Sequence, residues 1–449
     1  MEQSFIAYIE KSIKENWDLD ALTDYKGATL QYKDVARKIE KLHIIFEASG
    51  IRKGDKIAVC GRNSSHWGVT FLATLTYGAV VVPILHEFKA DNIHNIVNHS
   101  EAKLLFVGDM VWENLNENAM PLLEGIFLMT DFSILVSRSE KVDYAREHLN
   151  ELFGKKYPKN FRKEHISYHK DQPEELAVIN YTSGTTSYSK GVMLPYRSLW
   201  SNTTFAFEVL SLNSGDKVVS MLPMAHMYGL AFEFLYEIAV GCHIYYLTRM
   251  PSPKIIFQAF AEVKPRIVIA VPLIIEKIIK KNVLPKLETP TMKLLLKVPF
   301  VNDKIKATVR DQVIQAFGGN FEEVIIGGAA FNHDVEQFLK MIDFPYTVGY
   351  GMTECGPIIC YEDWKRFKPG SCGKAAPRME VKILSPDPKN IPGEIICRGP
   401  NVMLGYYKNE EATRDVLEPD GWLHTGDLAL MDREGNVTIK GRSKNMLLV

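Results

Sequence analysis

Neither sign of charge dominates this sequence, because 53 lysine and arginine residues stand against 54 aspartate and glutamate residues. A chain without a net field does not draw nucleic acid or an anionic membrane to its whole surface. We therefore expect no nucleic-acid partner, and any charged ligand must be bound locally.

Long apolar runs are also lacking. Residues 1–20 mix charged with apolar side chains, unlike a secretory signal. The stretch 229–247 is interrupted by Glu233, Glu237 and His243, whereas a membrane span needs about 20 mostly uncharged residues. We interpret this stretch as buried core and expect a cytoplasmic protein.

Paired cysteines are missing as well. The six cysteines, at positions 60, 242, 355, 360, 372 and 397, include no Cys-x-x-Cys pair and have no histidine pair nearby at zinc-ligand spacing. We expect reduced, packed thiols rather than a disulfide framework or a structural metal site. No repeat or low-complexity linker is present, and the oligomeric state is not indicated.

What the sequence does contain is a strand–helix–strand pattern. Residues 56–60 predict a short strand, residues 66–77 a helix, and Gly78 its C-cap before an apolar run at 80–82. Similar apolar runs follow at 104–107, 267–270 and 324–326. Continuous apolar strands of this kind are typical of parallel sheets covered on both faces.

The pattern changes to short strands and turns after about Tyr350. Strands are predicted at 379–383 and 394–398, and a hairpin over 428–439. The predicted fold class is α/β: two doubly wound α/β lobes over about 1–349, and a smaller β-barrel-like lobe over about 350–441.

A hydroxyl-rich loop at residues 181–191 follows a strand predicted at 176–180. Its serine and threonine hydroxyls and its backbone N–H groups can donate to several phosphate oxygens, and Lys190 adds a point charge. It is not a Walker A loop, because Gly191 follows the lysine and residues 192–195 are extended. Composition alone leaves a solvated loop as an equal alternative.

Four further segments follow in order: Gly-Gly-Ala-Ala at 327–330, Tyr-Gly-Met-Thr-Glu at 350–354, Gly-Trp-Leu-His-Thr-Gly-Asp at 421–427 and Gly-Arg-Ser-Lys at 441–444. Together with the loop they resemble the motifs of the adenylate-forming superfamily, which includes acyl-CoA synthetases, luciferases and peptide-synthetase adenylation domains. Ser187 and Ser189 depart from that family, which more often has glycine and proline there.

The resemblance implies an ATP site. The residues it assigns to the nucleotide are Thr182, Ser183, Gly184, Thr185, Thr186, Lys190, Gly328, Ala329, Ala330, Tyr350, Gly351, Thr353, Asp427 and Arg442. Thr353 would donate to the α-phosphate, and Glu354 would hold Mg²⁺, a hard cation that prefers carboxylate and phosphate oxygens. Asp427 would accept both ribose hydroxyls.

Each of these roles has a structural alternative. Tyr350 could be a core aromatic, Glu354 a surface carboxylate, Asp427 a turn-stabilising side chain and Arg442 a solvated cation.

The acid that would be activated is indicated by two segments. His226, within 222–229, resembles the residue that lines the carboxylate end of the family's acyl pocket; a satisfied buried histidine is the alternative. No aspartate follows between 223 and 231 to pair with an amino acid. The aromatic stretch 230–236 could wall an apolar tunnel or simply pack in the core.

Residues 367–374 resemble long-chain fatty acyl-CoA ligases in particular. The resemblance therefore implies ATP-dependent activation of a fatty acid to acyl-AMP and then to acyl-CoA, with His226, Lys190, Thr353 and Glu354 as catalytic residues. The alternatives are an aryl or short branched acid–CoA ligase and a non-catalytic AMP- or acyl-binding protein.

In the family, the Gly-Arg-x-Lys hinge precedes a small C-terminal domain that supplies a catalytic lysine and part of the CoA tunnel. Only five residues follow Lys444. We expect an AMP-binding core over 1–441, a hinge remnant over 442–449, no C-terminal domain, and hence impaired ligase activity.

A basic segment stands out between Lys277 and Arg310, which contains nine lysine and arginine residues but only Glu288 and Asp303 as acids. A basic amphipathic face would suit peripheral contact with the anionic inner face of a membrane. Solvated helix faces are the alternative.

Overall fold

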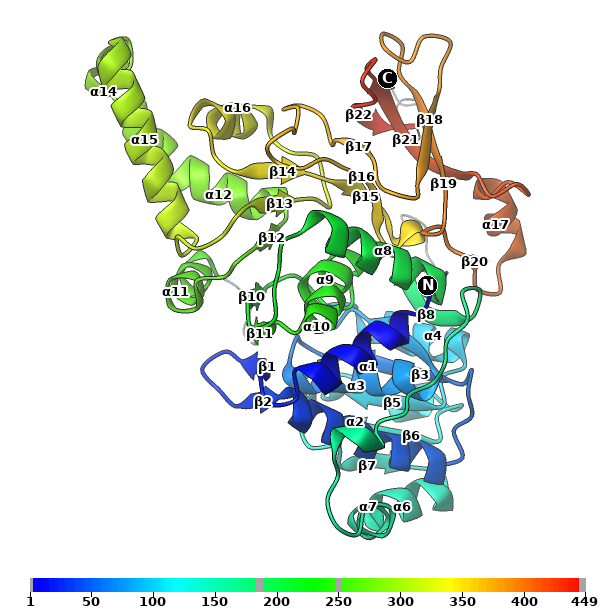
Figure 1. Cartoon of the computed structure of the whole chain (residues 1–449). Helices are drawn as coiled ribbons and strands as arrows, with labels where there is room; N and C mark the ends of the chain where they lie inside the picture. The colour runs from blue at the N-terminus through cyan, green and yellow to red at the C-terminus, as the bar shows by residue number, and fades with distance from the viewer. Residues whose placement is uncertain (1–2, 183–188, 248–251, 444–449) are drawn as a thin grey trace.

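The computed structural model describes residues 3–182, 189–247 and 252–443 (Figure 1). An eight-stranded sheet organises the N-terminal part, in the order β20-β9-β8-β4-β3-β5-β6-β7. Its strands are β3 (Lys56–Cys60), β4 (Val80–Ile84), β5 (Leu104–Val107), β6 (Gly125–Leu128), β7 (Ile134–Ser137), β8 (Leu176–Thr182), β9 (Lys190–Pro195) and β20 (Gly405–Tyr406). The central strands are parallel, as the apolar runs predict.

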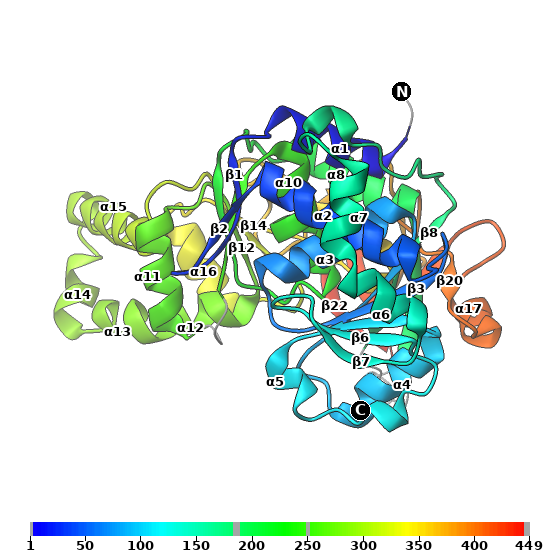
Figure 2. The ribbon, with the colours of Figure 1, turned by 90° about the horizontal axis from the view of Figure 1, so that it is seen from below.

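Helices cover both faces of this sheet (Figure 2). Ile57 and Val59 of β3 point into the core shared with α2 (Tyr32–Ala48) and α3 (Ser65–Tyr77). Ala58 and Cys60 point to the opposite core, beneath α4 (Ala90–Ser100) and α5 (Asp109–Trp112). The helices α1 (Phe5–Glu15), α6 (Glu140–Glu147) and α7 (Leu149–Lys156) pack around α2.

Two smaller sheets follow in the middle of the chain. One has the order β10-β11-β1-β2 and the other β12-β13-β14. Their strands are β1 (Asp20–Asp24), β2 (Thr29–Gln31), β10 (Lys217–Ser220), β11 (His243–Tyr246), β12 (Val268–Ala270), β13 (Val324–Ile326) and β14 (Tyr346–Val348). Because β12, β13 and β14 are parallel, their carboxyl ends meet at one edge.

The helices of this middle part are α8 (Tyr196–Val209), α9 (Met227–Leu230), α10 (Tyr236–Val240), α11 (Pro253–Val263), α12 (Pro272–Asn282), α13 (Leu284–Leu287), α14 (Pro290–Leu295), α15 (Pro299–Ala316) and α16 (His333–Met341). A π-helical turn, Ala231–Leu235, joins α9 to α10. Helices α14 and α15 project away from the body (Figure 1).

Short antiparallel sheets follow Tyr350, in the orders β15-β16-β17 and β18-β19-β21-β22. They comprise β15 (Tyr350–Gly351), β16 (Ile358–Tyr361), β17 (Lys374–Ala375), β18 (Glu380–Leu384), β19 (Gly393–Arg398), β21 (Leu423–Met431) and β22 (Val437–Arg442), with α17 (Glu410–Val416) between β20 and β21. The predicted hairpin is confirmed, since Met431 pairs with Val437. Within the described residues these strands form open sheets rather than a closed barrel, and the α/β class is confirmed.

No helix in the described part of the chain is long and apolar enough to cross a membrane. The interpretation of residues 229–247 as core is confirmed for the aromatic stretch, because Phe232, Phe234 and Tyr236 are all buried.

Candidate functional site

The hydroxyl-rich loop is the connection of a β-hairpin. Thr182 ends β8 and pairs directly with Lys190, which begins β9. The two ends of the loop are therefore held side by side, which fits an anion-binding connection between two strands. Ser183, Gly184, Thr185 and Thr186 lie outside the described residues.

The segment with Gly328, Ala329 and Ala330 follows β13 at the carboxyl edge of the parallel sheet. The Gly327 amide donates to the Ala270 carbonyl at 3.1 Å, and the Gly349 amide donates to the Ile326 carbonyl at 2.9 Å. These bonds bring the ends of three strands together at the edge where open α/β sheets bind ligands. Gly328 has φ +90°, and glycine adopts that conformation without a Cβ penalty.

Tyr350, Asp427 and Arg442 form a linked group beside this edge. The Tyr350 hydroxyl donates to Asp427 Oδ2 at 2.5 Å, and Arg442 Nε lies 3.3 Å from Asp427 Oδ1. Strand pairing explains the second contact, because Asp427 of β21 faces Arg442 of β22. Burial and the adjacent Asp427 carboxylate raise the pKa of Tyr350 well above its usual range.

Glu354 lies in a short 3₁₀ turn, Thr353–Cys355, and is buried, with 7% of its surface exposed. Among the described residues, its carboxylate accepts a weak hydrogen bond from the Tyr406 hydroxyl at 3.5 Å, and a hydrogen bond from its own backbone amide lowers its pKa. Burial raises the pKa of Glu354, and the charges of Arg442 and Lys190 oppose that rise. The carboxylate is therefore flanked by cations yet keeps unused acceptor capacity.

Gly351 is required on steric grounds. A Cβ placed there would lie 2.2 Å from the Pro357 carbonyl oxygen. The chain doubles back at this point, since the Met352 amide donates to the same carbonyl at 2.9 Å. This close approach presents Thr353 and Glu354 on a fixed turn.

Sequence reasoning missed the residues that hold this turn. Asn202 of α8 donates to the Cys355 carbonyl and accepts from the Ile358 amide, both at 3.0 Å. Tyr406 of β20 contacts Glu354, and its ring lies 5.2 Å from Lys190 Nζ. No local pattern marks either residue, because the pairing of β20 with β9 joins segments far apart in sequence.

His226 is brought near the end of β8. The Asn180 side-chain amide donates to the Ala225 carbonyl at 2.8 Å, which ties the segment before His226 to the strand that ends at Thr182. His226 is exposed, and its Nδ1 accepts from the Tyr228 amide at 3.3 Å. Desolvation by surrounding protein lowers the pKa of His226, which favours a neutral ring.

The aromatic stretch after His226 packs in the core. The Phe234 ring meets Trp67 and Phe71 edge to face. Glu233 accepts the Leu222 amide at 2.8 Å, so that the π-helical turn is anchored to the segment leading to His226. π-Helical turns occur frequently at functional sites.

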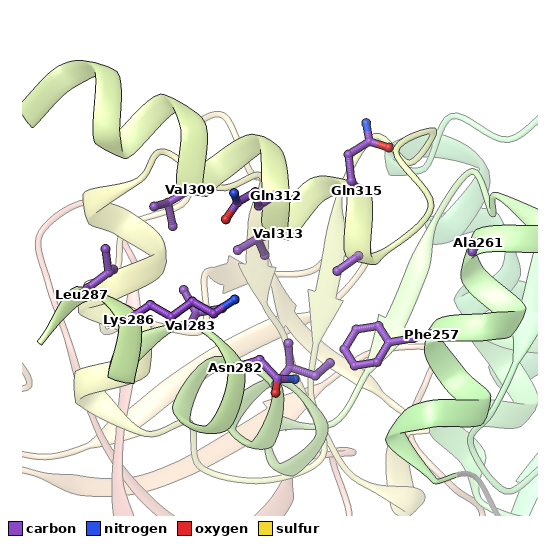
Figure 3. A pocket seen from close by; sticks show the side chains of 12 residues that line it. Phe257, Ala261, Asn282, Val283, Lys286, Leu287, Val309, Gln312, Val313 and Gln315 are labelled. Atoms are coloured by element: carbon purple, nitrogen blue, oxygen red, sulfur yellow. The ribbon is translucent and has the colours of Figure 1, made fainter. Parts of the chain in front are cut away.

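Two cavities of the protein are candidates for ligand binding. One, of about 430 Å³, is lined by Tyr181, Lys190, Gly191, His99 and Tyr407. The other, of about 450 Å³, lies between α11, α12–α13 and α15, and the motif residues do not line it (Figure 3). No group of three or more histidine, cysteine, aspartate or glutamate side chains suited to a metal ion occurs among the described residues.

The fold and the site define an α/β protein of the adenylate-forming class. The chain belongs to the AMP-binding enzyme family, whose model matches residues 9–407. It is 28% identical over 92% of its length to long chain acyl-CoA synthetase 3 of Arabidopsis thaliana, of which it spans 66%. It is 26% identical over 100% of its length to the long-chain-fatty-acid–CoA ligase of Escherichia coli O157:H7, of which it spans 78%.

Solved structures show the same fold. Apo MatB from Rhodopseudomonas palustris superposes with a TM-score of 0.77 at 21% identity, covering 99% of this chain and 79% of that one. The inhibitor-bound N-terminal domain of FACL13 from Mycobacterium tuberculosis gives 0.74 at 20% identity, covering 98% and 100%.

Proposed function

We propose that this chain activates a fatty acid with ATP to form acyl-AMP, and that the acyl group is then transferred to CoA. The observation that carries the proposal is the convergence of Lys190, Glu354 and the Tyr350–Asp427–Arg442 group on one side of the fold. Adenylation requires a cation, a metal-binding carboxylate and a nucleoside-binding site. In this proposal Lys190 supplies the cation, Glu354 the carboxylate, and the Tyr350–Asp427–Arg442 group the nucleoside-binding site.

In this proposal a carboxylate oxygen attacks the α-phosphorus of ATP, the bond to the β-phosphate breaks and pyrophosphate leaves. The chain contributes mainly positioning and charge neutralisation. The Tyr350 ring would stack on adenine at the strand edge, beside Gly328, Ala329 and Ala330. Asp427 would accept the ribose hydroxyls, while Thr353 would donate to the α-phosphate.

The thiol of CoA then attacks the acyl carbonyl, and AMP leaves. His226 would border the reacting carboxyl. Its lowered pKa keeps the ring neutral, so it would orient the substrate by hydrogen bonding rather than by charge.

Magnesium fits the buried Glu354 carboxylate of this site. Proteins usually hold Mg²⁺ through one or two carboxylates together with substrate phosphates, so a protein cage is not required. Glu354 meets that requirement, because it is buried and the hydrogen bond it accepts from Tyr406 is weak. Bound there, Mg²⁺ would neutralise charge on the departing pyrophosphate.

A fatty acid is favoured as the substrate because of the names of the relatives. The Arabidopsis protein is named a long chain acyl-CoA synthetase, and the Escherichia coli protein a long-chain-fatty-acid–CoA ligase. An aryl acid is the second candidate, since 4-coumarate–CoA ligase 1 of Oryza sativa is 26% identical over 94% of this chain, which spans 71% of that protein. All six cysteines are free and buried, which supports a reducing, cytoplasmic location for either activity.

The test is ATP–pyrophosphate exchange with a panel of carboxylates, from short branched and aryl acids to long-chain fatty acids. We expect exchange to be highest with medium-to-long fatty acids and to fall about 10²–10³-fold in Glu354→Gln. Highest exchange with an aryl acid would favour the second candidate. AMP binding without exchange for any acid would favour the non-catalytic alternative, and failure to bind either ATP or AMP would refute the proposal.

A further inference from the structure

Helices α12 to α15 form an arm whose outer part, α14 and α15, stands away from the body in both views of the molecule (Figures 1 and 2), while α12 has four buried residues and packs on α16. Helix α14 contains no buried residue, and Val313 is the one buried residue that the structure describes in α15. An 18-residue helix is about 27 Å long and normally buries an apolar stripe. Most of the arm thus lacks a packing partner within the described chain.

Apolar side chains gather at the tip of the arm, where α14 meets α15. Leu294 is 67% exposed, Val298 45% and Phe300 84%. Other exposed large apolar residues, such as Leu122 and Ile391, lie in separate parts of the sequence. A concentrated apolar patch marks an interaction surface, whereas isolated exposed residues do not.

Cations occur along the whole arm, and Lys293 and Lys297 are those next to the exposed apolar residues of the tip in the sequence. The nine basic residues of the arm between 277 and 310 are Lys277, Lys280, Lys281, Lys286, Lys293, Lys297, Lys304, Lys306 and Arg310. Four acids, Glu276, Glu288, Asp303 and Asp311, occur in the whole arm, residues 272–316. A partner must therefore be apolar and anionic at once. A second copy of this chain would bring like charges together, whereas an anionic bilayer supplies phosphates above an apolar interior.

The root of the arm is also incompletely packed. The cavity of about 450 Å³ separates α15 from α11, with Phe257 on one side and Val309 and Val313 on the other (Figure 3). Lys286 is the charged residue among those that line it. The inner face of the arm is thus mixed, with Asn282, Gln312 and Gln315 among the apolar side chains that line the cavity.

We propose that the arm docks this protein on an anionic lipid bilayer, with Leu294, Val298 and Phe300 entering the acyl region. Lys293 and Lys297 contact lipid phosphates beside them. The surface stands apart from the nucleotide-binding residues, so the inference holds whichever acid the enzyme activates.

The experiment is co-sedimentation of the whole chain with vesicles, without ATP, acid or CoA. One set contains phosphatidylcholine alone and the other contains phosphatidylcholine and phosphatidylglycerol. We expect binding to the anionic vesicles that falls at high salt. The double variant Lys293→Gln/Lys297→Gln should weaken it roughly 30-fold, since each cation near the surface contributes about fivefold. Leu294→Ser/Phe300→Ser should weaken it more than about tenfold.

Matched controls use exposed residues elsewhere, Leu122→Ser/Ile391→Ser for the apolar pair and Lys254→Gln/Lys389→Gln for the cations. Thermal unfolding and AMP binding are measured for every variant, to show that each is folded. Equal binding to the two vesicle types, or tip variants that bind like their controls, would overturn the proposal. Self-association lost in the tip variants, without vesicle binding, would also overturn it by making the tip an interface between copies.

Discussion

Glu354→Gln is the substitution that separates the proposed metal role from a structural one. It removes the charge of a buried carboxylate while keeping its shape and its ability to accept from Tyr406. We expect two effects of opposite sign, weaker use of Mg²⁺-ATP and a more stable unliganded protein. A side chain that served only the fold would not give this combination.

The effect on the rate of ATP–pyrophosphate exchange is large because one charged group is being removed from the site of charge transfer. Loss of a single electrostatic group at such a site commonly costs about 10²–10³ in rate, or about 2.7–4 kcal/mol. AMP binding without Mg²⁺ needs no metal carboxylate and should change by less than about threefold, which is below 1 kcal/mol.

The stability effect follows from the direction of the pKa shift. Burial raises the pKa of Glu354 above its ordinary value of 4.5, so the folded state favours the protonated carboxyl. The contribution of Glu354 to the free energy of unfolding is complete below pH 4.5 and is lost as pH rises through the folded-state pKa. Glutamine undergoes no such loss, so the melting temperature of the variant should exceed that of the parent by a margin that grows as pH rises above 4.5.

Glu323→Gln is the matched control. Glu323 is also buried and is hydrogen-bonded by a tyrosine, Tyr361, at 3.2 Å. It precedes β13 and so lies at the opposite end of that strand from Gly328. Calorimetry with Mg²⁺-ATP and with AMP, together with melting curves across pH, decides the matter. The reasoning fails if Glu354→Gln weakens both ligands equally, or if Glu323→Gln reproduces its binding defect.

Three other outcomes are expected. Burial raises the pKa of Glu323 from 4.5 to about 8, so the contribution of this residue to stability should decline between those pH values. The melting temperatures of the parent and of Glu323→Gln should therefore converge near pH 4.5. Arg442→Ala should lower ATP affinity measured by calorimetry but change unfolding by less than about 0.5 kcal/mol, because that side chain is 71% exposed. Gly351→Ala should unfold at markedly lower temperature than Gly328→Ala, since the first meets a backbone oxygen at 2.2 Å and the second meets no atom closer than 3.6 Å.

The sequence predicts the main strands and helices well, because their signals are local. The strand predicted at 56–60 and the C-cap at Gly78 are both observed. The small sheets of the C-terminal part are less predictable, because β15 and β17 are only two residues long and are defined by their partners. Their open arrangement depends on such pairings rather than on composition.

The candidate site likewise contains residues that the sequence identifies and residues that it does not. Asp427 and Glu354 stand in recognisable motifs, whereas Asn202 and Tyr406 are placed beside them by tertiary contacts alone. The roles of the motif residues stay predictions, as does the division of the chain near Tyr350. The loop residues 183–186 lie outside the described residues.

Buried carboxylates alone do not identify a functional site in this protein, and their surroundings distinguish them. Glu233 is fully buried but accepts backbone amides from Met221 and Leu222, which accounts for its presence as an anchor. Glu237 is 0% exposed, and burial raises its pKa well above its ordinary value, which favours the neutral acid. Glu354 differs from both, because Lys190 and Arg442 favour its charged form while the hydroxyl that donates to it is 3.5 Å away. A buried carboxylate whose charged form is favoured by neighbouring cations is suited to holding a metal ion, and on that contrast the metal assignment depends.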